Sequence, residues 1–416
     1  MCTSRKLAPG WTTNDSQPPV VLIGGSRGYN ALSVARAFGR RGRMVHLLLD
    51  PGDDSLATRS RFVRSVARPG AGDLTFDPWM DWCYRSAPPG SVLIPCADRG
   101  LEFISRHRAL LQAAGLRPAP GVDEILLALL DKERTYEMAR EVGMAVPRTE
   151  RVTGVAQACR LARTFELPFA LKPRVSHLFA PHSDGHKAVV IRSYQDLEKP
   201  VRRFVEAGLA MILTEIVPGP EENYCSYYTY LDEDGRPLAE FTKRKLRQYP
   251  VGFGEGTYHV TDWAPDVAEA GLRLFSRLGL QGMGNVEFKR DQRDGRLTLI
   301  ECNARLTAAN ELVRRAGVDF AEIIYQRAIG AHVSRRVGSY TENLGLWFPM
   351  HDLLAFAAMR SEGKTSTSRW LSSIARRHVS PVLDCRDLGP TLTKGGHLVK
   401  WASRRATATL RDRMSR

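Results

Sequence analysis

The stretch LIECNARLT, residues 299–307, places an acid, an amide and a guanidinium at alternate positions: Glu301, Asn303 and Arg305. Successive side chains of a β-strand point to opposite faces, so a strand here would present all three on one face, with Leu297 and Leu299 behind them. A strand that begins with leucines and ends with these polar groups predicts a functional site at its end.

A second acid is expected to face this trio. The turn sequence QRDG, residues 292–295, predicts a hairpin that brings Glu287 opposite Glu301. Two carboxylates held close together resist double ionisation, so a positive charge must compensate them. Glu287, Glu301 and Asn303 offer only oxygen ligands, which suit a hard cation such as Mg²⁺ that completes its shell with water and phosphate. Arg305 would reach the same phosphate, whereas a polar sheet surface is the alternative.

Residues earlier in the chain suit a nucleotide. Lys172 lies in the apolar stretch PFALKP, where an unpaired ammonium is costly to bury, so we expect it to point at an anion. Lys132 precedes a helix and would alone be a solvated charge. In TEIVPGPEEN, residues 214–223, a strand end could offer backbone groups to adenine and Glu222 could accept from ribose hydroxyls; an ordinary strand and loop is the alternative.

Taken in order, these residues resemble the ATP-grasp superfamily, over roughly residues 18–330. Its members include D-alanine:D-alanine ligase, biotin carboxylase and the large chain of carbamoyl-phosphate synthase. The resemblance implies ATP, clamped between two α+β subdomains behind an N-terminal α/β domain, and two Mg²⁺ or Mn²⁺ ions. The roles that it implies are phosphate binding by Lys132 and Lys172, adenine binding by Glu215, Ile216 and Val217, ribose binding by Glu222, metal binding by Glu287, Glu301 and Asn303, and stabilisation of the transferred phosphate by Arg305.

Two loops are individual to this chain. In FTKRKLRQYP, Lys243 and Lys245 share one strand face and could meet the γ-phosphate or an acidic substrate, so we assign them catalytic roles, with Arg247 and Tyr249 as substrate residues. A basic hairpin edge is the alternative. The loop after Lys172 departs from the glycine-rich flap of many relatives, because it has only Gly185 and carries three histidines, His177, His182 and His186. A polar lid is favoured there over a zinc site.

Strands alternating with helices predict a parallel α/β unit near the N-terminus. The turn after its first strand contains Gly24, Gly25 and Gly28, which is not the dinucleotide pattern, although Asp50 ends the next strand as a ribose-binding acid would. Gly24 and Gly25 could still bind an anionic part of a substrate at the helix N-terminus.

The expected fold is therefore α/β plus α+β, in four parts. Residues 1–17 are expected to be disordered, 18–120 to form the N-terminal α/β domain, and 121–330 the ATP-grasp domain, with subdomains 121–192 and 193–330. Residues 331–416 are expected to form a basic helical extension. That last part has 15 Lys or Arg against 6 Asp or Glu, so it is either a solvated basic surface or a contact with an anionic partner.

Composition places further bounds. Seven cysteines without a C-x-x-C spacing argue against a disulfide framework or a structural zinc site, and Cys302 is expected to be a core residue. No apolar stretch has the length of a signal peptide core or a membrane span, so we expect a cytoplasmic protein. Its basic end could still contact the inner membrane surface or an envelope-assembly complex. No specific nucleic acid partner is predicted, and the oligomeric state is left open.

The expected activity is ATP-dependent ligation of a small carboxylic acid to an amine through an acyl phosphate, with release of ADP and phosphate. Three alternatives stay open. One is another ATP-grasp outcome, such as a carboxylase or a carbamoyl-phosphate-type synthase. The second is a silent ATP-binding scaffold, and the third is a dehydrogenase that binds NAD(P) through the turn at Gly24.

Overall fold

The computed structural model describes residues 3–4, 17–25, 29–70, 75–179, 182, 187–252 and 254–396. Most of the N-terminus expected to be disordered, Gly28, Gly185, His186 and the end of the basic extension lie outside these ranges. No helix within the ranges is both long and apolar enough to cross a bilayer.

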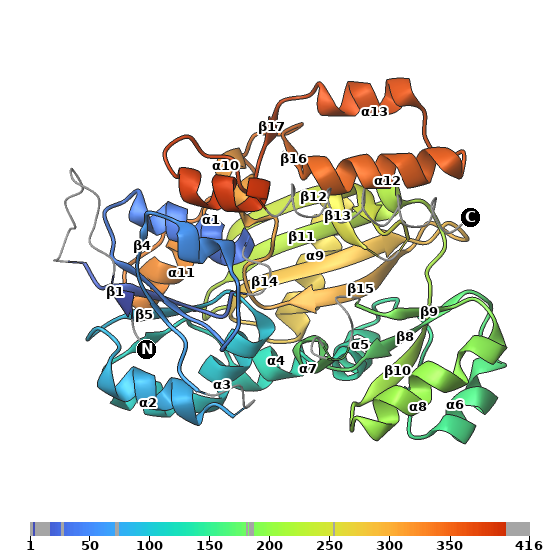
Figure 1. The fold of residues 1–416 in the computed structure, drawn as a ribbon, viewed down its shortest axis with the longest axis horizontal. Helices are drawn as coiled ribbons and strands as arrows, with labels where there is room; N and C mark the ends of the chain where they lie inside the picture. Colours follow the sequence, from blue (N-terminus) through green and yellow to red (C-terminus); the bar gives the residue numbers. More distant parts are fainter. Residues whose placement is uncertain are drawn as a thin grey trace, which may run out of the picture.

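The N-terminal part is a six-stranded sheet in the order β1-β4-β3-β2-β5-β6 (Figure 1). Its pairs are parallel except β1 with β4, which confirms the predicted parallel α/β unit. Strand β2 is buried at every position, as expected for a parallel sheet covered on both faces. The elements are β1 (Thr3–Ser4), β2 (Val20–Ile23), α1 (Tyr29–Gly39), β3 (Val45–Leu48), η1 (Leu56–Arg59), β4 (Val63–Ala67), α2 (Asp77–Arg85), β5 (Val92–Pro95), α3 (Asp98–Ala113), β6 (Arg117–Pro118) and α4 (Asp123–Ala128).

A small antiparallel sheet follows, in the order β7-β10-β8-β9. Strand β10 belongs to it, so this unit extends past residue 192, the boundary expected from the sequence. Helices α6 and α8 pack together beside it (Figure 1). The elements are α5 (Lys132–Glu141), β7 (Thr149–Val152), α6 (Val155–Ala162), β8 (Phe169–Pro173), α7 (Ser176–Phe179), β9 (Val189–Ile191), η3 (Tyr194–Asp196), α8 (Glu198–Glu206), β10 (Met211–Glu215) and η4 (Glu221–Asn223).

The largest sheet has seven strands, in the order β15-β14-β11-β12-β13-β16-β17. The hairpin predicted at QRDG is confirmed, because β14 pairs with β15 and Gly295 in the turn has a φ of 75°. A second hairpin joins β11 to β12, with Gly235 in its turn at a φ of 74°. The elements are β11 (Tyr224–Leu231), β12 (Pro237–Tyr249), β13 (Glu255–Thr261), α9 (Pro265–Arg277), β14 (Gly282–Arg290), β15 (Leu297–Asn303), α10 (Asn310–Ala316), α11 (Phe320–Ala328), β16 (Gly345–Trp347), α12 (Pro349–Ser361), α13 (Thr367–Ile374) and β17 (His378–Val379).

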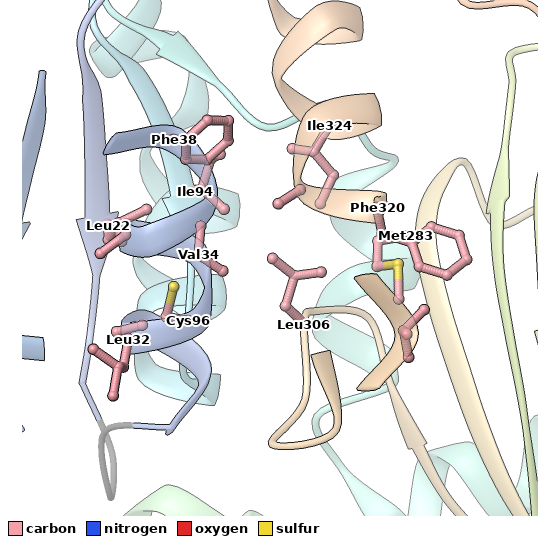
Figure 2. Close-up of a cluster of buried hydrophobic side chains, with 14 of the residues drawn as sticks. Leu22, Leu32, Val34, Phe38, Ile94, Cys96, Met283, Leu306, Phe320 and Ile324 are labelled. Atoms are coloured by element: carbon pink, nitrogen blue, oxygen red, sulfur yellow. The ribbon is translucent and has the colours of Figure 1, made fainter. Parts of the chain in front are cut away.

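The two faces of the large sheet are covered differently. One face packs against α9, where Tyr227 and Phe288 of the sheet join Leu274 in a buried cluster. The other face is covered at one end by α10 and α11, and its core continues without a break into α1, β2 and β5 of the N-terminal sheet (Figure 2). The remaining end of this second face carries the site described below.

The expected separate basic extension is not confirmed, because residues after 330 are built into the rest of the fold. Strand β16 pairs with β13, and β17 pairs with β16, so both belong to the large sheet. Further on, the buried Asp387 accepts a hydrogen bond from Arg36 of α1, at 2.8 Å. The chain therefore returns from the large sheet to the N-terminal unit.

Candidate active site

Glu301 and Asn303 lie in β15, which ends at Asn303, and Arg305 follows in a bend, so the strand does not present all three residues as predicted. The face of the leucines also differs from the prediction. Glu301 is paired with Glu287 as predicted, whereas Leu299 is paired with the next residue, Phe288, so Ile300 is an extra residue in a β-bulge. The bulge reverses the alternation, so Leu299 lies in the core on the α9 face while Glu301 and Asn303 are half-buried. The prediction that the leucines share a face with Glu301 is therefore wrong.

Strand register places a polar row across the open face. Lys243 of β12 pairs with Ser226 of β11, Ser226 pairs with Glu287 of β14, and Glu287 pairs with Glu301 of β15. Side chains two residues apart share a face, so a second row contains Asn285 and Asn303, which are also paired. Asn303 Nδ2 donates to Asn285 Oδ1 at 3.4 Å, which leaves the amide oxygen of Asn303 available on the side of the glutamates.

Buried lysines compensate Glu287. Lys245 Nζ donates to Glu287 Oε1 at 3.2 Å and lies 3.7 Å from the centre of the Tyr224 ring. Burial acts to raise the pKa of Glu287, but the charges of Lys245 and Lys243 outweigh it and lower this pKa. Lys243 Nζ lies 3.2 Å from both Ser226 Oγ and His259 Nδ1, and burial lowers its pKa to about 8.

The other side of the site comes from α5, β8 and α7. Lys132 Nζ donates to Ser176 Oγ at 2.5 Å and lies 3.9 Å from Glu301 Oε1. Burial and the charge of Lys132 lower the pKa of the half-buried Lys172 to about 8, against the opposite effect of Glu301 and Glu287. The pocket between these elements is lined by Asp98, Leu129, Leu130, Lys132, Thr135, Tyr136, Ser176, Ile300, Glu301, Cys302, Asn303 and Ala304.

The N-terminal unit contributes acids to this pocket through α3. Arg305 Nε donates to Asp98 Oδ1 at 2.5 Å. Burial acts to raise the pKa of Asp98, but the charge and hydrogen bond of Arg305, together with the charges of Lys132 and His177, outweigh it and lower this pKa. One turn later, Glu102 Oε2 lies 2.7 Å from Nε2 of His177, the residue after Ser176. His177 therefore links the predicted lid to α3 rather than to a metal.

The segment expected to bind adenine lies beside the same face. Lys289 Nζ donates to the carbonyl oxygen of Val217 at 2.8 Å and lies 4.9 Å from the Tyr224 ring centre. Glu221 is buried and interacts electrostatically with Lys289, so it lies on the same face as the site. Glu215 and Ile216 end β10 and follow it; Glu215 accepts from the backbone of Arg148 at 3.1 Å and pairs with Arg293 at 2.6 Å.

Several predicted residues lie apart from this cluster. Glu222 accepts from Arg369 of α13 with both oxygens, each at 2.8 Å. Arg247 forms a buried double hydrogen bond with Asp352 of α12, at 2.7 and 2.9 Å, which accounts for its charge without a substrate. Tyr249 is the last residue of β12 and is paired with Glu255 of β13.

Gly24 and Gly25 lie at the end of β2 in the N-terminal unit. The Gly25 N–H donates to Asp53 Oδ2 at 3.1 Å, so an acid of this chain already occupies that donor. Gly24 has a φ of 77°, and a Cβ there would lie 2.8 Å from Ala97 Cβ. The close packing explains the glycines without a ligand.

The donor set fits a hard cation. Among the residues described, no three His, Cys, Asp or Glu side chains converge on one point, so a metal here would depend on the amide oxygen of Asn303 beside Glu287 and Glu301. Carboxylate and amide oxygens are the ligands that Mg²⁺ prefers. The buried lysines around them suit an anion that arrives with the metal.

Comparison with known proteins agrees with this geometry. The family model described as the ATP-binding domain of the carbamoyl-phosphate synthase large chain matches residues 263–336, which include β14, β15 and Arg305. D-aspartate ligase of Enterococcus faecium (strain Aus0004) is 27% identical over 243 residues, or 56% of this chain and 57% of that protein. The chain therefore resembles members of the ATP-grasp superfamily in this region. It thus aligns with little more than half the length of that relative.

Solved structures share the ATP-grasp fold at low sequence identity. The biotin carboxylase domain of Hydrogenobacter thermophilus 2-oxoglutarate carboxylase, bound to MgADP and bicarbonate, superposes with a TM-score of 0.60 at 16% identity, covering 79% of this chain and 74% of that one. L-amino acid ligase from Bacillus licheniformis has a TM-score of 0.57 at 16% identity, covering 75% and 74%.

Sequence reasoning missed several side chains of the candidate site. Asn285 and Lys289 lie two residues either side of Glu287, and Ser226 and Tyr224 alternate along β11 in the same way. Extending the alternation from Glu287 in both directions would have found the first pair. Asp98 had no such signal, because it comes from a helix of the N-terminal unit.

Proposed function

We propose that this chain is an ATP-dependent ligase that joins a carboxylic acid to an amine through an acyl phosphate. The observation that supports it most is the polar row from Lys243 through Glu287 to Glu301, with Asn303 beside it and Lys132 and Lys172 across the pocket. Two ATP-grasp proteins that it resembles, D-aspartate ligase and L-amino acid ligase, are named for this class of reaction.

Separate groups of residues would bind the nucleotide, the metal ions and the transferred phosphate. ATP would lie between the small and large sheets, with adenine at Val217 and its phosphates near Lys132, Lys172 and Lys243. Mg²⁺ ions held by Glu287, Glu301 and Asn303 would neutralise phosphate charge as it develops. Arg305 is held by Asp98, so its guanidinium would be oriented in advance to stabilise the transferred phosphate.

The reaction has two steps. A carboxylate oxygen of the acid attacks the γ-phosphorus, the bond to the bridging oxygen breaks, and ADP leaves. The amine nitrogen then attacks the acyl carbon, loses a proton and expels inorganic phosphate, which leaves the amide. Positioning and electrostatics carry both steps, so no nucleophilic side chain is required.

The test is ADP release by the purified chain from Mg·ATP, with pooled amino acids and small carboxylates as acids and amines. We expect turnover that requires both an acid and an amine and that falls at least about 100-fold in Glu301→Ala and Asn303→Ala. Glu269→Ala is the matched control, because Glu269 is an exposed acid on α9, on the far face of the large sheet.

Other outcomes would overturn the proposal in distinct ways. Turnover supported by bicarbonate without an amine would indicate a carboxylase. ATP binding without turnover in any pool would favour a silent scaffold. Turnover in Glu301→Ala equal to that of the unsubstituted chain would remove the metal site from the reaction.

A further inference from the structure

The C-terminal segment carries the most exposed large apolar side chains of the described residues. Leu392 and Leu383 are 71% and 63% exposed, and Leu388, with 55%, equals the next most exposed, Tyr84. Single exposed leucines are ordinary on a protein surface. Three exposed leucines in one short segment are instead typical of a surface that binds a protein or membrane partner.

The local packing holds these leucines outward. Residues 388–396 are helical, and Leu388 and Leu392 are one turn apart on the same face. The opposite side is docked on the N-terminal unit: Pro390 is buried, and a Cβ on Gly389 would lie 2.2 Å from the carbonyl oxygen of Arg59. In Figure 1 this helix is the red one on the outer surface beside α1.

The acids of the segment are turned inward. Asp387 Oδ2 accepts from Arg36 Nε and from Ser60 Oγ, each at 2.8 Å. Asp384 pairs with Arg40 of α1. The neighbouring cations Arg376, Arg377 and Arg386 are exposed. Exposed cations and exposed leucines therefore occur together in this part of the chain, while its acids are paired.

The sequence beyond the described helix continues this character. Residues 397–416 contain six cations against one acid, Asp412, together with Trp401, Leu398 and Leu410. The cations are Lys400, Arg404, Arg405, Arg411, Arg413 and Arg416. In the sequence, these residues follow directly after the helix that contains Leu392.

We propose that residues 383–396 are a docking surface for an anionic lipid bilayer. Acidic headgroups attract the cations, and the boundary with the acyl chains takes up the leucines, so one partner satisfies both features. A nucleic acid would satisfy the cations but offers little to exposed leucines on a helix. This proposal is independent of the ligase activity proposed above.

The test is flotation of the full chain with vesicles of phosphatidylcholine alone or mixed with phosphatidylglycerol, at about 0.1 M salt. We expect binding to the mixed vesicles only, with partitioning reduced about ten-fold in Leu388→Gln/Leu392→Gln. The matched control is Leu110→Gln, an exposed leucine on α3, which lies away from this helix (Figure 1). Circular dichroism and denaturant unfolding establish that both variants fold.

Three results would overturn the proposal. The first is equal binding to neutral and mixed vesicles, or no binding to either. The second is partitioning of the double variant equal to that of Leu110→Gln. The third is binding to a DNA duplex that excludes the vesicles, which would assign the positive surface to nucleic acid. ADP release is measured separately in solution, so a failure of either proposal leaves the other unchanged.

Discussion

The half-buried Lys172 and the buried Lys243 have pKa values that are lowered to about 8, chiefly by loss of hydration. Their ordinary pKa is 10.5, so in the free protein both lose their charge as the pH rises through about 8. A bound polyphosphate favours the charged forms, so binding above this pH must also take up protons.

We therefore expect the affinity for a non-hydrolysable ATP analogue to fall as the pH is raised from about 7 to about 9.5. Lys172→Met should weaken binding at neutral pH and flatten this dependence, as measured by titration calorimetry. Lys199→Met, at an exposed position of α8, should keep both the affinity and the slope. An unchanged slope in Lys172→Met would contradict the placement of Lys172 at the phosphates.

Two neighbouring acids, Glu221 and Glu222, are candidates for binding the ribose, and their contacts differ. The resemblance points to Glu222, but Glu222 faces Arg369 while the buried Glu221 faces Lys289. Glu221 also accepts from the Gly252 N–H at 2.9 Å. We infer that Glu221 is the better placed of the two to meet the ribose.

Glu221→Gln should raise the KM for ATP at least about ten-fold with little change in kcat, because the loss is in binding. Glu222→Gln should change the KM less than about two-fold, since an exposed ion pair contributes little. The measurement is steady-state ADP release, or analogue binding where no substrate pair is yet known. The reverse order of effects would return the role to Glu222.

At this scale, sequence reasoning depended on alternation along strands. It predicted the pairing of Glu287 with Glu301, because a short turn sets the register of a hairpin. It gave the wrong face to Leu299, because nothing in LIECNARLT marks Ile300 as the bulged residue. A bulge reflects contacts from outside the strand, which a local pattern does not contain.

Among the elements, helix α5 supplies one of those outside contacts. Tyr136 Oη donates to the carbonyl oxygen of Ile300 at 2.8 Å, so the bulge is bonded to the same helix that begins at Lys132. The buried hydroxyl thereby links the position of Glu301 to the position of Lys132 across the pocket.

Tyr136→Phe should lower the free energy of unfolding by about 1–3 kcal/mol, because the carbonyl of Ile300 is left without its buried donor. It should also raise the Mg²⁺ concentration needed for half-maximal ATP binding. Tyr84→Phe, at an exposed position of α2, should change stability by less than about 0.5 kcal/mol. Denaturant unfolding of both variants is the measurement, and equal stability of the two would contradict the role of the hydroxyl.

Helix α12 shows why some elements escaped prediction. Its Asp352 is fully buried and accepts from Arg247, from Thr257 at 3.0 Å, and from the indoles of Trp347 at 3.1 Å and Trp370 at 3.0 Å. For this part of the chain the sequence predicted only a basic helical extension. The partner of a buried acid cannot be identified from spacing when it lies 105 residues away.

At the scale of the whole molecule, the last part of the chain closes the fold. Strands β16 and β17 complete the large sheet, and residues 381–387 bond to Arg36. Strand and helix patterns predicted the parallel N-terminal unit and the hairpin of β14 and β15, whereas the return of the chain to α1 has no local signature. The sequence therefore suggested a tail where the structure has a connection.

A chain that ends after Gly330 should not fold cooperatively, because it exposes the edge of β13 and leaves the buried Arg36 without its acid. A chain that ends after Gly396 retains all of these contacts and should unfold in a single transition close to that of the full chain. Circular dichroism during thermal unfolding distinguishes the two. Cooperative folding of the shorter chain would show that residues 331–396 are dispensable to the core.

The bond from Arg36 to Asp387 joins residues 351 positions apart in the chain. Ribosomes add about 5–20 residues per second, so roughly 20–70 s separate the synthesis of these two partners. During that interval the N-terminal unit is outside the ribosome with Arg36 still hydrated, and its surface on α1 has nothing to cover it. The N-terminal unit is synthesised first, but it can reach its native packing only after residues close to the end of the described chain, including Asp387, have been synthesised.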